Sequence, residues 1–156
     1  LPTLWKVFKQ LVQSDKLQSL KQVKLKIDIS SFSYKNGYPE DSSGNGGGFV
    51  FDCRCLPNPG RQEAYAHLTG QHAEVINFLE KEKEVILFFE HITSIIDLAV
   101  KNYLDRDFSH LSISFGCTGG QHRSVYFAEK LSNYLLSKYP VTTSVHHTAE
   151  KNWELQ

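Results

Sequence analysis

Apolar residues alternate with polar ones in three short stretches of the chain, residues 22–29, 49–56 and 110–115. A period of two is the pattern of a strand with one buried face, so each stretch is predicted to form a strand. In the second strand Cys53 and Cys55 share one face, whereas Asp52 and Arg54 share the other.

Apolar residues recur at helical spacing in most of the remaining chain. The predicted helices cover residues 3–20, a segment through 75–79, residues 85–103 and residues 121–139. Pro140 then separates the last helix from a fourth strand at 141–147. The order β-β-α-α-β-α-β of the main body predicts an α/β domain with a small mixed sheet and helices packed on it. Its C-terminal end is a parallel β-α-β unit.

The chain divides near residue 21. Residues 1–21 are predicted to be a helical linker or the tail of a missing upstream domain, and residues 22–156 to be one domain of ordinary size. The chain contains no Met and begins at Leu1, which predicts that it is a domain of a longer protein.

Composition narrows the class of protein. The 17 Lys and Arg balance 17 Asp and Glu, which excludes a general polycation that binds nucleic acid by bulk charge. No apolar run approaches the roughly 20 residues of a membrane span, and no signal-peptide pattern is present. Three cysteines, an odd number, favour a reducing compartment, so the protein is predicted to be cytoplasmic. The sequence predicts neither a bound metal nor a cofactor.

The most informative segment is a glycine-containing turn between the third strand and the last helix, residues 116–124 (GCTGGQHRS). The backbone N–H groups of such a turn and the positive end of the helix favour a bound anion. Arg123 can donate a fork of two N–H groups to a phosphate or carboxylate, and Thr118 and Ser124 offer hydroxyls. The alternative is a plain tight turn with adjacent glycines at positive φ and a solvated arginine. The coincidence of glycines, arginine, hydroxyls and helix start favours the anion site.

The same turn allows a second interpretation. The spacing from Cys117 to Arg123, with five residues between them and a serine after the arginine, is that of cysteine-dependent phosphatases. In those enzymes a thiolate attacks phosphorus. Those enzymes usually carry His where this chain has Gly116, and they need a general acid, for which Asp52 and Asp41 are the candidates. A phosphatase is therefore the alternative, and a domain without catalytic activity is the main expectation.

Four segments carry a resemblance to a known family. They are residues 31–37 (SFSYKNG), 51–59 (FDCRCLPNP), 68–70 (LTG) and 116–126 (GCTGGQHRSVY). Together they resemble the C-terminal domain of the RapZ family, the bacterial RNase adapter proteins. The resemblance implies a regulatory α/β module that binds an amino-sugar phosphate, glucosamine-6-phosphate. In the family this module also binds small regulatory RNA and protein partners and self-associates.

The resemblance and the turn together predict a set of ligand-binding residues. These are Lys35, Asp52, Arg54, Cys117, Thr118, Gly119, Gly120, His122, Arg123 and Ser124. Asp52 and Arg54 either orient the ligand or simply pair with each other. Lys35 contacts ligand or RNA, or is solvated.

The sequence departs from the family pattern in three places. It has no G-x-x-x-x-G-K-[ST] motif of the kind that the family's N-terminal domain carries. Gly60 and Arg61 stand where relatives carry His and Trp. The segment from residue 145 to 153 lacks two of the family's arginines. The resemblance therefore implies metabolite binding more directly than RNA binding.

Overall fold

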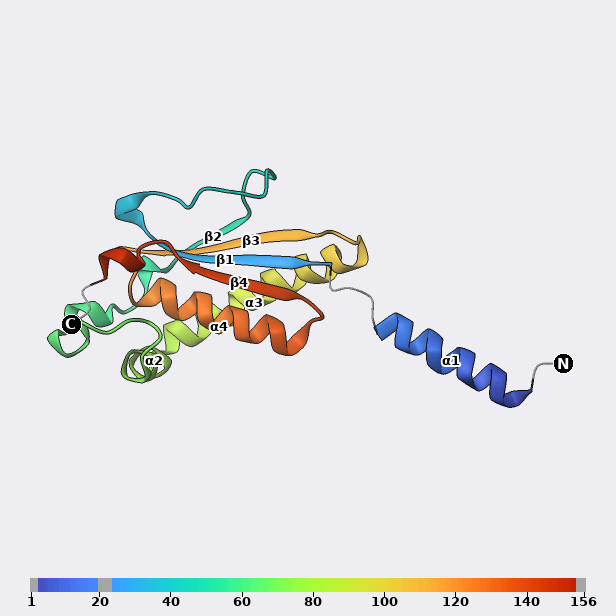
Figure 1. The fold of residues 1–156 in the computed structure, drawn as a ribbon. Helices are drawn as coiled ribbons and strands as arrows, with labels where there is room; N and C mark the ends of the chain where they lie inside the picture. Colours follow the sequence, from blue (N-terminus) through green and yellow to red (C-terminus); the bar gives the residue numbers. More distant parts are fainter. Residues whose placement is uncertain (1–2, 20–23, 154–156) are drawn as a thin grey trace.

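The computed structural model describes residues 3–19 and 24–153, and its centre is a four-stranded sheet in the order β2-β3-β1-β4 (Figure 1). The strands are β1 (Lys26–Ser33), β2 (Phe49–Asp52), β3 (His110–Cys117) and β4 (Thr142–His147). The helices are α1 (Leu4–Ser19), α2 (Ala73–Glu80), α3 (Lys83–Asp105) and α4 (Arg123–Lys138). The predicted α/β class is confirmed.

All four strands are parallel, where a mixed sheet was expected. Each connection between successive strands is a crossover long enough for parallel pairing. A long loop over residues 34–48 joins β1 to β2, the segment with α2 and α3 joins β2 to β3, and α4 joins β3 to β4. Helices α2, α3 and α4 lie on one face of the sheet, and the loop crosses the other face (Figure 1).

The hydrophobic core lies between the sheet and these helices. From β1 and β3 it takes Ile27, Ile29, Ile113 and Phe115, all fully buried, and Phe127 of α4 packs against them. Phe115 and Phe127 are stacked with ring centroids 5.9 Å apart. The alternate strand residues face away from the helices and are mostly polar, so only one face of the sheet builds the core.

Strand β2 ends four residues earlier than predicted. The Asp52 carboxylate accepts a hydrogen bond from the backbone N–H of Arg54 at 2.9 Å, and the chain turns into a short 3₁₀ helix, η2 (Cys53–Cys55). Cys53 is therefore buried and Cys55 exposed, so the expectation that they share one strand face is wrong. Burial raises the pKa of the Cys53 thiol, which is a neutral group of the core.

Two further boundaries differ from the sequence prediction. Strand β1 runs to Ser33, beyond the predicted end at residue 29, because it pairs with β3 along its whole length. The predicted start of this strand at 22–23 lies outside the described residues. Helix α4 begins at Arg123, two residues later than predicted, because Gln121 and His122 belong to the turn before it.

Helix α1 forms in the segment where the sequence predicts a helix, and it is drawn apart from the sheet in Figure 1. Its apolar side chains Leu4, Trp5 and Phe8 are exposed. Within residues 3–19 and 24–153, no helix is long and apolar enough to cross a membrane.

Candidate functional site

The candidate site lies at the carboxyl edge of the parallel sheet. The chain leaves β1 toward β2 over the open face, whereas it leaves neighbouring β3 toward β4 through α4 on the helix face (Figure 1). Neighbouring strands whose connections depart in opposite directions leave a crevice between them at the carboxyl edge, where open α/β sheets bind ligands. The turn that follows β3 starts at this crevice, beside the end of β1. The Ser33 hydroxyl donates to the carbonyl oxygen of Thr118 at 2.7 Å and ties the two strand ends together.

A cavity of about 460 Å³ opens beside this turn, and we call it the arginine cavity. The side chains of Arg54, Arg61 and Arg123 line it, and Glu84 supplies a carboxylate. The remaining lining residues are Cys55, Leu56, Pro57, Asn58 and Thr118. Three guanidinium groups face the Glu84 carboxylate and the Asp52 carboxylate paired with Arg54, so the net charge at the cavity is positive, which favours an anionic ligand.

Arg123 is 4% exposed and forms part of the cavity wall. Its Nη1 atom donates to the carbonyl oxygens of Leu56 at 2.8 Å, Arg54 at 3.0 Å and Cys53 at 3.3 Å. Its Nε atom is buried and has no hydrogen-bond partner among the described residues. Arg123 therefore holds the turn η2 in place through its Nη1 atom, whose hydrogen bonds go to the backbone of this turn and not to a ligand.

Arg54 is held from two sides. Its Nε and Nη2 atoms donate to the carboxylate of Asp52 at distances between 2.7 and 3.0 Å, and its guanidinium lies 3.7 Å from the ring centre of Tyr34. Hydrogen bonds from Arg54 lower the pKa of Asp52. The structure shows the pairing of Asp52 with Arg54, and a role of the pair in orienting a ligand stays a prediction. The pair keeps Arg54 at the cavity.

The turn after β3 is mostly buried, and its exposed part is Thr118 with Gly119. Gly120 adopts φ = 65°, and a Cβ there would lie 2.8 Å from the backbone nitrogen of Ser33 and from the Cβ of Ala149. The carbonyl oxygen of Gly120 accepts a hydrogen bond from the Trp153 indole at 2.9 Å. The turn thus packs closely between β1 and the C-terminal segment.

Two side chains of the turn hold the neighbouring loop. The Nε2 atom of His122 lies 2.8 Å from the carbonyl oxygen of Tyr65, to which it donates. The Gln121 amide donates to the carbonyl oxygens of Ala66 and Leu68 at 2.9 and 2.8 Å. A Cβ at Gly60 would lie 3.1 Å from the His122 ring, so the loop passes close to this histidine.

The structure brings together part of the predicted set. Thr118, Arg54 and Arg123 line the arginine cavity. Lys35 is exposed on the short 3₁₀ helix η1 (Tyr34–Asn36) and does not line it. Cys117, Gly120, His122 and Ser124 are buried and build the turn.

Sequence reasoning missed Asn58, Arg61 and Glu84 as members of the site. Arg61 follows a Pro-Asn-Pro-Gly turn. Its position directly after a turn that adjoins the predicted site is the one signal in the sequence that indicates Arg61. Glu84 stands in the first turn of α3, and the helical pattern of this segment does not indicate that a carboxylate there reaches the site.

The geometry does not favour the phosphatase interpretation. Cys117 is 3% exposed, its Sγ atom lies 3.1 Å from the Ser124 hydroxyl oxygen, and it does not line the cavity. A general acid must be protonated near neutral pH. Instead, hydrogen bonds from Ser43 lower the pKa of Asp41 to about 2, and the pKa of Asp52 is lowered as well.

The fold and the cavity define an α/β domain with an arginine-lined cavity at the carboxyl edge of its sheet. The family model of the RapZ C-terminal domain matches residues 25–151 of the chain, and the chain belongs to this family. The match covers the sheet, helices α2 to α4 and the turn after β3, and it leaves α1 outside.

Relatives from Staphylococcus aureus strains JH9, Newman and N315 are each named nucleotide-binding protein. Each is 41% identical over 121 residues, which is 78% of this chain and 38% of the relative. The chain thus spans less than two fifths of the length of these relatives.

Proposed function

We propose that the arginine cavity binds a phosphorylated amino sugar such as glucosamine-6-phosphate, and that the domain has a regulatory role. The observation that carries the proposal is the convergence of Arg54, Arg61 and Arg123 on one cavity with a single carboxylate, Glu84. Hydrogen bonds between guanidinium and phosphate are the strong, charge-assisted kind. Membership of the RapZ C-terminal family supports the same ligand class.

Each end of such a ligand has a partner in the cavity. Arg54, Arg61 and the Thr118 hydroxyl supply donors for the phosphate oxygens, and Arg123 adds positive charge behind them. The Glu84 carboxylate is the partner for the sugar ammonium group, because it is the single acidic side chain among the lining residues. The Asn58 amide offers a donor and an acceptor to the sugar hydroxyls.

Calorimetry on the wild-type domain tests this proposal with four ligands: glucosamine-6-phosphate, glucose-6-phosphate, glucosamine and inorganic phosphate. We expect the amino-sugar phosphate to bind most tightly, glucose-6-phosphate next and the two fragments weakest, because each fragment loses the partner of one end. Equal affinity for all four, or no binding at all, would contradict the proposal. Release of phosphate from the sugar would instead favour the phosphatase.

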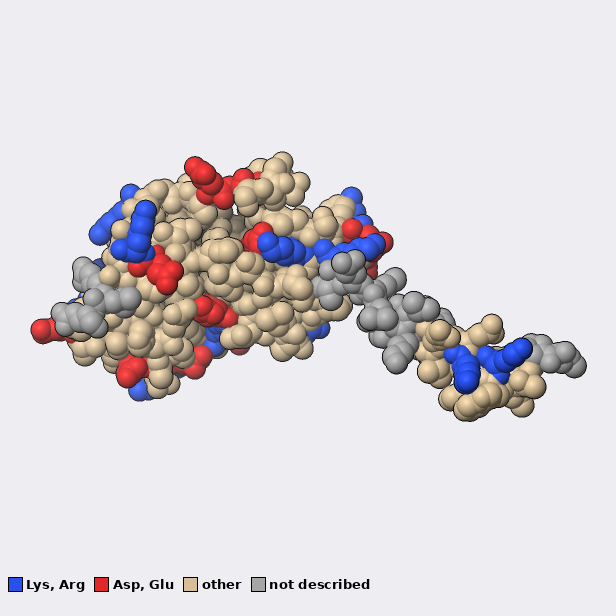
Figure 2. Space-filling view, in the orientation of Figure 1, with Lys and Arg blue, Asp and Glu red and all other residues tan. Residues whose placement is uncertain are grey.

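We also propose that the domain is part of a longer protein, since it spans 38% of the length of its relatives. The odd number of cysteines favours a cytoplasmic location for that protein. Binding of small RNA and self-association stay predictions from the family resemblance. On the face shown in Figure 2, Lys and Arg side chains form small separate groups among acidic and uncharged ones. A gel shift with charge reversal at Lys24 and Lys26 tests the RNA prediction. Unchanged RNA binding would exclude the surface around these two lysines as the binding face.

A further inference from the structure

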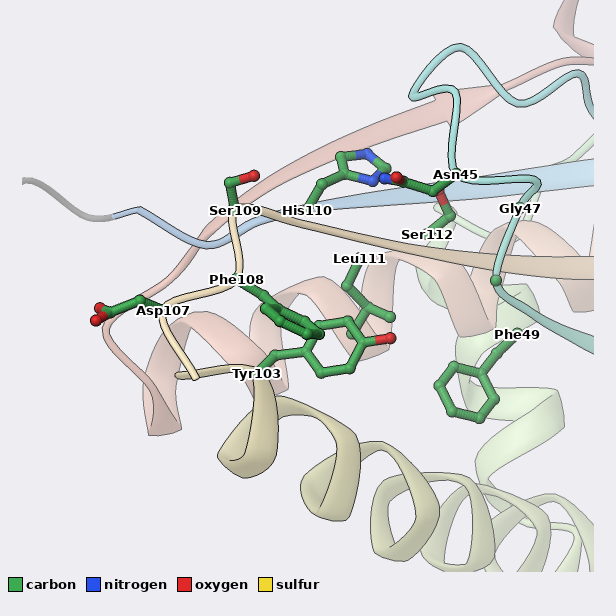
Figure 3. Close-up of a pocket in the computed structure, with 11 residues that line it drawn as sticks. Asn45, Gly47, Phe49, Tyr103, Asp107, Phe108, Ser109, His110, Leu111 and Ser112 are labelled. Atoms are coloured by element: carbon green, nitrogen blue, oxygen red, sulfur yellow. The ribbon is translucent and has the colours of Figure 1, made fainter. Parts of the chain in front are cut away.

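A second cavity, of about 660 Å³, lies at the opposite edge of the sheet, where β3 begins (Figure 3). We call it the aromatic cavity. It lies between the end of α3, the turn at 107–109, the first residues of β3 and the glycine-rich loop before β2. It shares no lining residue with the arginine cavity.

Aromatic rings stand on two sides of the aromatic cavity. Tyr103 and Phe108 pack edge to face with centroids 4.8 Å apart on one side, and the Phe49 ring stands on the other (Figure 3). The Tyr103 hydroxyl points toward the space between this ring pair and the Phe49 ring (Figure 3). Aromatic side chains that flank an open space are suited to a flat ring, which can stack against them.

The wall between these rings is a partly open strand edge, which the loop covers at Ser112, where Gly48 packs against the backbone carbonyl group. Strand β3 pairs with β1 from His110 onward, but β2 begins only opposite Ile113. In the described part of the chain, the stretch 110–112 therefore has a neighbouring strand on one side alone. Residues 109–112 line the cavity consecutively. Backbone N–H and C=O groups in the open part of such an edge, before Ser112, are available to the donors and acceptors on the rim of a heteroaromatic ring.

The charges around the aromatic cavity are unfavourable for phosphate. Among the described residues, no Lys or Arg lines it, whereas Asp107 does. Helix α3 ends at Asp105, so the negative end of its dipole is directed at this region. His110 is bonded to the Asp28 carboxylate at 2.7 Å, which commits its Nε2 atom. Two cations lie next to the cavity, but both already have a protein partner: Lys24 pairs with Asp107 at 3.7 Å, and the guanidinium of Arg106 lies 4.4 Å from the centre of the Phe108 ring. A phosphate group would therefore meet negative charge and cations that are already engaged.

We propose that the aromatic cavity binds a nucleobase or nucleoside that carries no phosphate. The ring stacks among Tyr103, Phe108 and Phe49, and its polar rim bonds to the open edge of β3. A groove of about 590 Å³ over the polar face of the sheet shares Gly47, Gly48 and Ser112 with this cavity. It offers the Ser30 and Ser114 hydroxyls to a ribose.

Titration of the ¹⁵N-labelled domain with adenosine, guanosine, cytidine and uridine, and with their 5′-monophosphates, tests this proposal by NMR. We expect at least one nucleoside to shift the amide signals of residues 109–112 and to bind at least about fivefold more tightly than its monophosphate. Absence of binding by all four nucleosides would overturn the proposal. A monophosphate that binds as tightly as its nucleoside, or more tightly, would overturn it as well.

Ring-removing variants locate the site. Tyr103→Leu and Phe49→Leu each keep apolar volume, and each is expected to weaken nucleoside binding about tenfold, as loss of a stacking partner does. Tyr103→Phe keeps the ring and retains most of the affinity. Trp5→Leu removes an exposed ring from α1 and is the control, with no expected change. Equal affinity in wild type and both leucine variants, or an equal loss in the control, would overturn the proposal.

Discussion

The Nη1 atom of Arg123 lies 2.8 Å from the carbonyl oxygen of Leu56, and the bond joins the start of α4 to the turn that carries Arg54. One cavity arginine thus positions another. The sequence pattern suggested a simpler role, in which Arg123 alone forks onto the anion. The structure makes this arginine a buried support of the cavity wall as well as a source of charge.

Substitution of Arg123 is expected to reduce both stability and ligand affinity. In Arg123→Lys the ammonium keeps the charge but cannot reach the same three carbonyl groups in the same geometry. We expect a loss of roughly 1–3 kcal/mol in the free energy of unfolding, the cost of leaving buried acceptors unbonded. Urea unfolding measures it, and calorimetry measures the accompanying loss of affinity for glucosamine-6-phosphate. A variant of native stability and affinity would show that these bonds are dispensable.

Asp52→Asn tests whether the carboxylate positions Arg54. Asparagine can still accept the hydrogen bond from the backbone N–H of Arg54, so η2 is retained, but the charged fork to the guanidinium is lost. We expect little change in melting temperature and a several-fold loss of affinity for glucosamine-6-phosphate. Asp41→Asn, in the loop over the open face, is the matched control. Equal affinity of the two variants for the ligand would show that the Asp52 carboxylate does not position Arg54 for binding.

The two adjacent glycines of the turn are expected to differ sharply. Gly120→Ala places a Cβ 2.8 Å from neighbouring atoms at φ = 65° and is expected to destabilise the domain by about 1–3 kcal/mol. Gly119→Ala meets nothing within 4 Å and has no positive φ, so its stability should stay near that of wild type. Thermal unfolding of both variants checks the difference. Similar melting temperatures would contradict the packing of the turn against β1 and Ala149.

Acid sensitivity is expected at Asp97, which joins α3 to α4. Its carboxylate accepts hydrogen bonds from Tyr134, Lys138 and Tyr139 at 2.8, 2.6 and 2.7 Å. Burial raises the pKa of Asp97. The three hydrogen bonds together lower it by more than burial raises it, so the pKa lies below its ordinary value of 3.8. A carboxyl whose pKa is lowered by folding stabilises the native state above 3.8, and that contribution is lost as the pH falls through the folded value.

Asp97→Asn should therefore be less stable than wild type at pH 7, by roughly 1–2 kcal/mol. The difference should shrink as the pH falls from 3.8, the ordinary pKa, toward the lower pKa of the folded state, where the native carboxyl takes up a proton. Urea unfolding at several pH values measures this. A difference that is independent of pH would show that the charge of Asp97 contributes nothing.

The sequence predicted the parts of the fold that depend on local pattern. The alternation of Ile27 and Ile29 with polar residues fixes a strand and its buried face, and the turn at 116–124 was correctly placed between a strand and a helix. Alternation does not reveal strand direction, however, so the all-parallel sheet was not predicted. The end of β2 was missed because a single hydrogen bond from the backbone of Arg54 to Asp52 turns the chain there.

The site was predicted in part for the same reason. Thr118 and Arg123 belong to one short segment whose chemistry is visible in the sequence. Arg61 and Glu84 reach the cavity from a loop and a helix that only the tertiary structure brings together. A local sequence pattern can indicate an anion site, but it does not show which charged residues from other segments line that site.

The central claim is that an arginine-lined cavity holds the phosphate of an amino sugar, and calorimetry on two arginine variants tests it most directly. Arg61→Gln removes a cavity guanidinium, whereas Arg106→Gln removes the same charge from a residue that does not line the cavity. We predict that Arg61→Gln weakens glucosamine-6-phosphate binding at least tenfold, in keeping with roughly 1.5–3 kcal/mol for hydrogen bonds to a charged group. We predict that Arg106→Gln binds the ligand as wild type does. Unchanged affinity in Arg61→Gln, or an equal loss in both variants, would contradict the account.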